Sequence, residues 1–307
     1  MIASRLIVLS GPTASGKSAL ALALAREFPL EIVNADSLQV YRRFDIGTAK
    51  PTAAERGEVP HHLIDVADPD EPYDAGRYVR EADRAIGEIR ARGKHPLLVG
   101  GTGMYLRALL RGLDPLPSDA RVRGELSRRW DAEGGAALHA ELARIDPETS
   151  AKVHPSDRLR VLRALEIAAV SGIPPSRARA SWSSGGARRG CLFLALWPDR
   201  DTLYGNISAR TEEMFRRGLA EEVRGLLARG FDRSLKPMMA LGYRHAAGHL
   251  LDGVPLSGTI EAVKRDTRRY AKRQLTWLSS EPDLLRIVPG EAARSPRDLV
   301  RMYLFCS

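Results

Sequence analysis

Short apolar runs recur along the chain, and longer segments with helical character separate them. The runs that are typical of buried strands are Leu6–Ser10, Glu31–Asn34, Leu97–Val99, Cys191–Leu196 and Leu284–Val288. An Ala/Leu-rich segment over Ala19–Arg26, directly after the first run, predicts a helix. Strands that alternate with helices favour a parallel sheet covered by helices. The pattern therefore predicts an α/β fold.

The alternation stops between Gly112 and Arg189, where no convincing strand occurs. Helical patterns cover Arg121–Glu133, Ala136–Arg144 and Arg158–Ser171. We therefore predict a mainly helical insertion over 113–189, inside a core formed by 1–112 and 190–307. Segments poor in helix and strand formers mark its two ends, at Asp114–Pro117 and Ser183–Gly186. Beyond the fourth strand, the pattern predicts helices over Asp201–Arg229, Leu235–Leu251 and Thr259–Leu278.

A phosphate-binding motif follows the first strand. The sequence fits G-x-x-x-x-G-K-[ST] at every fixed position, and it stands between a strand and a helix, as that motif requires. Its backbone N–H groups are expected to surround linked phosphates, with Lys17 neutralising their oxygens and the Ser18 hydroxyl reaching Mg²⁺. The core is therefore predicted to be a P-loop NTPase-like sheet. The motif consists of Gly11, Pro12, Thr13, Ala14, Ser15, Gly16, Lys17 and Ser18.

Asp36 follows the second strand, at the carboxyl edge of the predicted sheet, where ligands of open α/β sheets bind. A carboxylate there can act as a general base toward a nucleophile, or hold Mg²⁺ through water. The alternative is that Asp36 caps a helix, which is a common role for aspartate.

The third strand ends in Gly100-Gly101-Thr102-Gly103, whose glycines allow close approach to a ligand and whose Thr102 supplies a hydroxyl. No aspartate ends this strand, which argues against a standard ATPase or GTPase. His61 and His62 are adjacent, so in a strand they point to opposite sides and make a poor metal chelate. We expect no metal site at this histidine pair.

Composition favours a globular protein, with 44% hydrophobic and 28% charged residues. We expect neither a signal peptide nor a membrane span, and therefore a cytoplasmic location, because no apolar stretch reaches about 18 residues. The two cysteines, Cys191 and Cys306, form no disulfide framework or metal-ligand pattern. Nothing in the sequence demands an oligomer, and we expect a monomer.

The net charge of +9 is concentrated in the second part of the chain. Residues 1–112 carry 15 basic and 14 acidic side chains, whereas the remaining residues carry 32 and 24. Arg160 and Arg163 share one predicted helix face, and basic residues form a stripe over Lys264–Arg273. Such a stripe predicts a polyanionic partner, with Tyr270 or Trp277 available for stacking. A solvated charged face is the alternative.

Taken together, these motifs resemble the bacterial tRNA dimethylallyltransferase family. The resemblance spans nearly the whole chain, in the expected order, and rests on several segments at once. They are the phosphate loop, Asp36–Tyr41, Ile46–Pro51, His61–Asp65, Gly100–Leu106, Arg160–Glu166, Gly242–Arg244 and Lys272–Leu278.

The resemblance implies transfer of a dimethylallyl group from dimethylallyl diphosphate to N6 of the adenosine on the 3′ side of the anticodon. Lys17, Arg210 and the cofactor Mg²⁺ would neutralise the leaving diphosphate, and Asp36 would take the N6 proton. Ser37 and Gln39 would fix the flipped-out adenine, and Thr102 would help to hold that arrangement.

The same resemblance implies contacts to tRNA on the helical insertion and on the basic helix. The residues concerned are Asp36, Ser37, Leu38, Gln39, Thr102, Arg123, Leu159, Arg160, Val161, Leu162, Arg163, Gly242, Tyr243, Arg244, Lys272, Arg273, Gln274, Leu275, Thr276, Trp277 and Leu278. The chain departs from the family pattern at Leu159 and His245, where glutamine is common, and at Ser279, where a basic residue is common. These departures concern RNA contacts and leave the reaction untouched.

Two other functions compete with this prediction. A P-loop small-molecule kinase would also pair a phosphate loop with a strand-end aspartate, but a small acceptor gives no reason for the basic stripe. A non-catalytic RNA-binding protein would not need Lys17, Ser18 and Asp36 intact.

Overall fold

The computed structural model describes residues 5–113, 116–178, 190–290 and 295–306. The chain divides into two compact units, one formed by Met1–Leu109 with Gly190–Ser307 and the other by Leu110–Arg189. The boundaries expected from the sequence, 112/113 and 189/190, lie within three residues of this division. The predicted exit segment Ser183–Gly186 and the first two residues of the entry segment lie outside the described residues.

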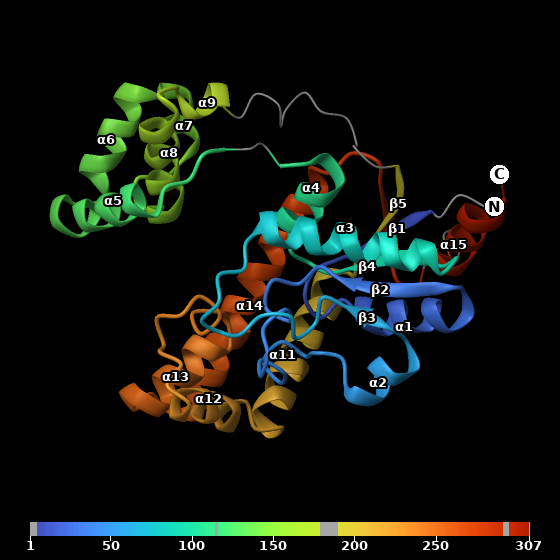
Figure 1. Cartoon of the computed structure of the whole chain (residues 1–307). Helices are drawn as coiled ribbons and strands as arrows, with labels where there is room; N and C mark the ends of the chain where they lie inside the picture. Colours follow the sequence, from blue (N-terminus) through green and yellow to red (C-terminus); the bar gives the residue numbers. More distant parts are fainter. Residues whose placement is uncertain (1–4, 114–115, 179–189, 291–294, 307) are drawn as a thin grey trace. The chain divides into compact units, whose positions relative to one another are not determined.

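The larger unit contains a six-stranded sheet in which every pairing is parallel (Figure 1). The strand order is β3-β2-β4-β1-β5-β6. The strands are β1 (Leu6–Ser10), β2 (Leu30–Asn34), β3 (His61–His62), β4 (His95–Val99), β5 (Cys191–Leu196) and β6 (Leu284–Ile287). Strands β1, β2 and β4 are buried along their whole length, which explains why they are continuous apolar runs in the sequence.

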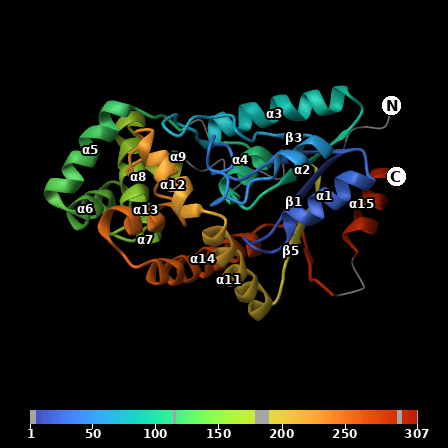
Figure 2. The ribbon, with the colours of Figure 1, turned by 90° about the horizontal axis from the view of Figure 1, so that it is seen from below.

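Helices cover both faces of this sheet (Figures 1 and 2). On one face, Ile7 and Leu9 of β1 pack against Leu24 of α1 and Leu304 of α15. Helix α3 lies over the other face, where it packs on β2 and β4. The helices of this unit are α1 (Lys17–Glu27), α2 (Ala53–Glu58), α3 (Ala75–Ala91), α4 (Gly103–Arg111), α11 (Arg200–Arg216), α12 (Leu219–Ala228), α13 (Tyr243–Asp252), α14 (Leu256–Ser279) and α15 (Pro296–Phe305).

The structure corrects two helices and adds one strand. The helix predicted over Asp201–Arg229 is divided into α11 and α12 at Gly218, whose φ of 96° ends the first helix. The helix predicted over Leu235–Leu251 begins only at Tyr243, after Gly242 with a φ of 86°. Strand β3 was not predicted, because it consists of two polar histidines at the edge of the sheet.

The described residues of the smaller unit form helices around a core of their own. Leu126, Leu138, Leu142, Val161 and Leu165 meet in this core. The helices are α5 (Ala120–Glu133), α6 (Gly135–Ile145), α7 (Pro147–Lys152), α8 (Arg158–Ser171) and α9 (Pro175–Ala178). Aspartates at the N-caps of α5, α7 and α8 accept backbone hydrogen bonds from the first turn and fix where these helices start.

Candidate active site

The phosphate loop connects β1 to α1 and leaves the start of α1 open. Gly16 precedes the helix with a φ of 88°, and no side chain caps the first turn. Gly11 at the start of the loop has a φ of 150°, a backbone conformation that residues with a side chain rarely adopt. Uncapped N–H groups at a helix N-terminus attract anions, so the start of α1 can receive phosphate oxygens.

Two cations lie at this loop, close enough to affect each other's protonation. Burial lowers the pKa of Lys17 to about 8, with Arg210 adding to the effect and Asp36 opposing it. Burial also lowers the pKa of Arg210, whose guanidinium donates to the Thr48 carbonyl at 3.3 Å. Lys17 Nζ itself donates to the Pro12 carbonyl at 3.3 Å. Two cations that repel each other without a full complement of counter-charges form a site for a multivalent anion.

Asp36 follows β2, and its carboxylate holds a turn, not the start of a helix. Its Oδ1 accepts hydrogen bonds from the N–H groups of Leu38 (2.9 Å) and Gln39 (3.4 Å) in that turn. Its own N–H donates to Asn34 Oδ1 at 3.1 Å. All the hydrogen bonds to this carboxylate in the described part of the chain reach Oδ1. Asp36 also lines two cavities, so its role in the turn leaves the carboxylate beside them.

Thr102 ties the glycine-rich turn after β4 to the segment that carries Asp36. Its Oγ1 accepts from the Ser37 N–H at 3.0 Å, and its own N–H donates to the Ala35 carbonyl at 3.2 Å. The carboxyl ends of β2 and β4 are therefore joined directly beside Asp36. Thr102 fixes the backbone on which Asp36 stands.

Two cavities meet at Asp36. The first, of about 450 Å³, is lined by the phosphate loop together with Gln39, Lys50 and Gln274. The second, of about 580 Å³, is lined by Ser37 and Leu38 together with residues of the α13 start and of α14. Both are lined by Thr13, Ala14, Asp36, Thr48, Arg210 and Tyr270.

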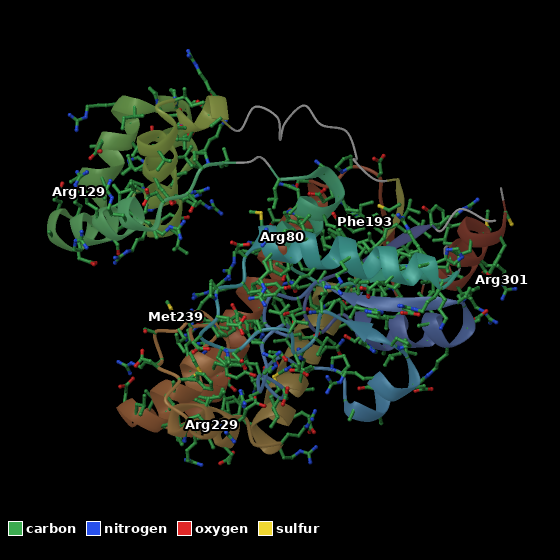
Figure 3. The ribbon with its side chains drawn as sticks, in the orientation of Figure 1. Arg80, Arg129, Phe193, Arg229, Met239 and Arg301 are labelled. Carbon is green, nitrogen blue, oxygen red and sulfur yellow. The ribbon has the colours of Figure 1, made fainter. Side chains whose placement is uncertain are left out.

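The second cavity has a basic rim and an exposed apolar residue. Arg244, Arg269 and Arg273 line it, and all three are exposed. Met239 also lines it and is 60% exposed, on the loop that precedes α13 (Figure 3). Burial raises the pKa of Tyr270, and Asp36 adds to this effect, so the phenol stays neutral beside the carboxylate. This cavity therefore offers cationic side chains to a polyanion at its rim.

A loop over Ile46–Pro51 lines the first cavity, and Glu222, one of its anchors, was not predicted from the sequence. Glu222 of α12 accepts from the backbone N–H groups of Asp45 (3.1 Å), Ile46 (2.7 Å) and Gly47 (3.3 Å). Lys50 is buried and donates to Asp45 at 2.6 Å and to Asp65 at 2.7 Å. Glu222 lies about 175 residues along the chain from the loop, and no local pattern marks such a partner.

Gln39 takes part in the same anchoring. Its Nε2 donates to the carbonyls of Thr48 (3.1 Å) and Ala49 (3.3 Å), so it holds the loop that also accepts from Arg210. The adenine contact expected for Gln39 would have to use its Oε1 or exchange these bonds.

Part of the predicted RNA-contacting set is buried. These side chains are Val161, Leu162, Tyr243, Gln274 and Leu278. Val161 and Leu162 pack in the core of the smaller unit, whereas Gln274 lines the first cavity. Trp277 is directed inward as well, because a Cβ on Gly103 would lie 2.4 Å from its ring. Gly101 and Gly103 thus make room for side chains of α14, whereas Gly100 lies against the Ala35 backbone and lines the first cavity.

The basic stripe on α14 also divides into inward and outward residues. Lys264 pairs with Glu212 and Glu261, and Arg268 donates to Ser208 Oγ at 2.9 Å and lies over the Tyr204 ring. Exposed basic residues remain at Arg265, Arg269, Lys272 and Arg273. Thr276 is exposed and Leu275 is half-buried on the same helix.

In the smaller unit, Leu159 and Arg160 are exposed at the start of α8. Arg123 and Arg163 both pair with Glu166, a buried carboxylate, at 2.9 and 2.8 Å. Burial alone would raise the pKa of Glu166, but hydrogen bonds from the two arginines bring it below its usual value. The ion pair between Arg123 and Glu166 therefore joins α5 to α8. More than half of the Arg123 side chain remains exposed and can contact a further partner.

The donors at the phosphate loop suit a magnesium ion that arrives with phosphates. No cluster of three or more His, Cys, Asp or Glu side chains able to hold a metal occurs in the described ranges. Mg²⁺ commonly keeps several waters and takes one or two protein oxygens together with substrate phosphates. The exposed Ser18 hydroxyl on α1 fits that mode. Among the described helices, none is long and apolar enough to span a membrane.

Comparisons with known proteins converge on one family. A family model described as IPP transferase matches residues 39–281, and one described as Isopentenyl transferase matches residues 4–64. The tRNA dimethylallyltransferase of Desulfosudis oleivorans is 47% identical over 301 residues, which cover 98% of this chain and 96% of that protein. The tRNA dimethylallyltransferase of Myxococcus xanthus is 48% identical over 292 residues, with coverage of 95% and 94%.

Solved structures are similar over the same extent. The tRNA isopentenylpyrophosphate transferase of Bacillus halodurans gives a TM-score of 0.68 at 37% identity, covering 93% of this chain and 90% of that one. A eukaryotic dimethylallyltransferase acting on tRNA gives a TM-score of 0.77 at 29% identity, with coverage of 93% and 74%.

Proposed function

The chain belongs to the IPP transferase family, and we propose that it transfers a dimethylallyl group from dimethylallyl diphosphate to tRNA. The acceptor is N6 of the adenosine that adjoins the anticodon on its 3′ side, and the products are N6-isopentenyladenosine and diphosphate. The position of Asp36 carries this proposal, because it lines both a phosphate-binding cavity and a cavity with a basic rim.

The first cavity would hold the diphosphate of the prenyl donor. The open N-terminus of α1, Lys17 and Arg210 would neutralise the charge that develops on the leaving oxygen. Ser18 would hold Mg²⁺ together with the phosphate oxygens, and the ion would supply further charge neutralisation there. The prenyl carbon would then face Asp36 at the junction.

The second cavity would receive the adenine, flipped out of its stack so that N6 reaches the prenyl carbon. During attack the N6–C bond forms, the C–O bond to diphosphate breaks, and the N6 proton passes to the Asp36 carboxylate. Thr102 and Ser37 would hold that carboxylate in place through the backbone. Arg244, Arg269 and Arg273 at the rim would contact the RNA phosphates.

The cavities are lined by residues of a single chain, so we propose that a monomer is sufficient. The kinase alternative loses its support, because the family match and the basic rim both favour an RNA acceptor.

The direct test is incubation of the purified protein with Mg²⁺, radiolabelled dimethylallyl diphosphate and an anticodon stem-loop that carries the adenosine. Label is expected in the RNA, and a stem-loop with guanosine in place of that adenosine serves as the matched control. Absence of label from the adenosine RNA, together with ATP-dependent phosphorylation of a small acceptor, would favour the kinase instead.

A further inference from the structure

Gln274 lies on the basic helix α14 but faces away from solvent. Its neighbours Lys272 and Arg273 are exposed, whereas Gln274 is 7% exposed and lines the phosphate cavity. Its Oε1 accepts from the Thr13 N–H at 2.8 Å, and its Nε2 donates to the Gly101 carbonyl at 3.0 Å. One amide therefore bridges the phosphate loop and the glycine-rich turn after β4.

The bridge requires glutamine chemistry. A backbone N–H can only donate and a carbonyl can only accept, so the side chain between them must offer one acceptor and one donor. Glutamate would satisfy Thr13 alone. The glycine opposite is required too, because a Cβ at Gly101 would lie 2.3 Å from Gln274 Nε2.

The two loops that Gln274 joins carry the two halves of the site. Thr13 belongs to the loop that would hold the diphosphate, and Gly101 precedes Thr102, which holds the segment that carries Asp36. Trp277 lies one turn further along α14 and packs on Gly103 of the same turn, with Arg107 over its ring at 5.7 Å. A shift of α14 would therefore move both loops together.

We propose that Gln274 is a positioning residue that couples RNA binding on the outer face of α14 to diphosphate binding at the phosphate loop. The inference rests on the proposed function, because it requires RNA to engage Lys272 and Arg273. RNA that fixes α14 would fix Thr13 through Gln274, and the affinity for diphosphate would rise. By linkage, diphosphate would raise the affinity for RNA by the same factor.

The test measures the Kd of inorganic diphosphate with Mg²⁺, alone and with a saturating anticodon stem-loop, so that no reaction occurs. In the wild type, the stem-loop is expected to lower this Kd. In Gln274→Met, which keeps the length but loses both hydrogen bonds, we expect diphosphate alone to bind about tenfold more weakly. The ratio of the two Kd values should fall to about one in this variant, because the bridge that links the loops is lost.

Two further variants separate coupling from damage. Lys272→Met, the exposed neighbour, should weaken stem-loop binding. At saturation it should keep the wild-type ratio of the two Kd values, because Arg269 and Arg273 still engage the RNA on α14. Gln274→Glu keeps the acceptor for Thr13 and should fold and bind diphosphate. The stem-loop should no longer lower the Kd of diphosphate in this variant. Gln274→Glu therefore decides the question if Gln274→Met does not fold.

A purely structural role for Gln274 would weaken diphosphate binding equally with and without RNA. The ratio of the two Kd values would then stay at its wild-type value in both Gln274 variants, and that result overturns the proposal. A ratio of one in a wild type that binds the stem-loop and transfers the prenyl group also overturns it, and leaves the transferase standing. A wild type that binds diphosphate but no stem-loop would contradict both the coupling through Gln274 and the proposed function.

Discussion

The Tyr243 hydroxyl donates a 2.6 Å hydrogen bond to Glu222, the carboxylate that holds the backbone of the loop over Asp45–Gly47. The tyrosine ring fills the space beside Gly47, where a Cβ would lie 2.5 Å from it. Burial raises the pKa of Tyr243, and the Glu222 charge adds to this effect, so the phenol remains a donor. The segment Gly242–Arg244, expected to contact RNA, therefore also anchors a wall of the active site.

Removal of that hydroxyl should destabilise the protein. Tyr243→Phe deletes a hydrogen bond to a charged acceptor, and we expect a loss of about 1.5 kcal/mol in the free energy of unfolding. Tyr105→Phe is the matched control, because the Tyr105 hydroxyl is buried and has no hydrogen-bond partner in the part of the chain that the structure describes. Urea denaturation should separate the two variants, and equal losses of stability would contradict the anchoring role.

The depressed pKa of Lys17 predicts how diphosphate binding depends on pH. Above pH 8 the free site increasingly holds a neutral amine, and a bound anion raises the pKa of that amine again. Affinity should therefore be greatest below pH 8 and fall by up to about tenfold per pH unit above it. Calorimetry in two buffers should show proton uptake on binding near pH 8 to 9.

Lys17→Met supplies the control for this pH dependence, because inorganic diphosphate also titrates. The variant should bind more weakly and keep only the part of the pH profile that belongs to the ligand. Superimposable profiles for the two proteins would show that Lys17 stays charged. In the absence of ligand, stability should rise from pH 8 toward 10.5, because the unfolded chain binds more protons in that window.

The core of the fold could be predicted from the sequence because its strands are buried on both faces. A continuous apolar run such as Leu6–Ser10, directly before a phosphate loop, is typical of a buried strand. The helix breaks at Gly218 and Gly242 were missed, because a glycine inside a helical pattern does not reveal its positive φ. The loop anchor Glu222 and the inward face of α14 depend on contacts between distant segments, for which a local pattern contains no information.

The site could be predicted only as far as its positions along the chain. The phosphate loop, Asp36 and Thr102 all follow strands, and the carboxyl ends of parallel strands meet at one edge. The sequence did not indicate in which direction each side chain points. Gln274 belongs to a segment that resembles an RNA-contacting motif, yet it points at the phosphate loop because α14 packs on Gly101 and Gly103.

Asp36 can be tested as the base without loss of its turn. Asp36→Asn keeps an oxygen that can accept from the N–H groups of Leu38 and Gln39, but it removes the proton acceptor. We expect the single-turnover rate of transfer to fall by about 10²-fold or more, with nearly unchanged affinity for the stem-loop.

Asp36→Ala also removes the hydrogen bonds from the Leu38 and Gln39 N–H groups. The further loss of rate relative to Asp36→Asn measures how much these hydrogen bonds contribute to transfer. A near-normal rate in the asparagine variant would remove Asp36 as the base.

The exposed basic residues of α14 should determine how RNA affinity depends on salt. Each phosphate contact that is lost lowers the slope of log K against log salt by about 0.7 to 0.9. Lys272→Ala combined with Arg273→Ala should therefore reduce the slope by about 1.5 and weaken binding of the stem-loop to the same extent whatever its sequence.

The control for this double variant has the same change in charge on a different part of the larger unit. Arg297→Ala combined with Arg301→Ala removes two exposed arginines from α15, at the end of the unit away from Met239 (Figure 3). These arginines pair with Glu27 and line neither cavity at Asp36, so the salt slope should stay at the wild-type value. If both double variants reduce the slope equally, the charge of the whole protein governs RNA binding, and α14 is only a solvated basic face.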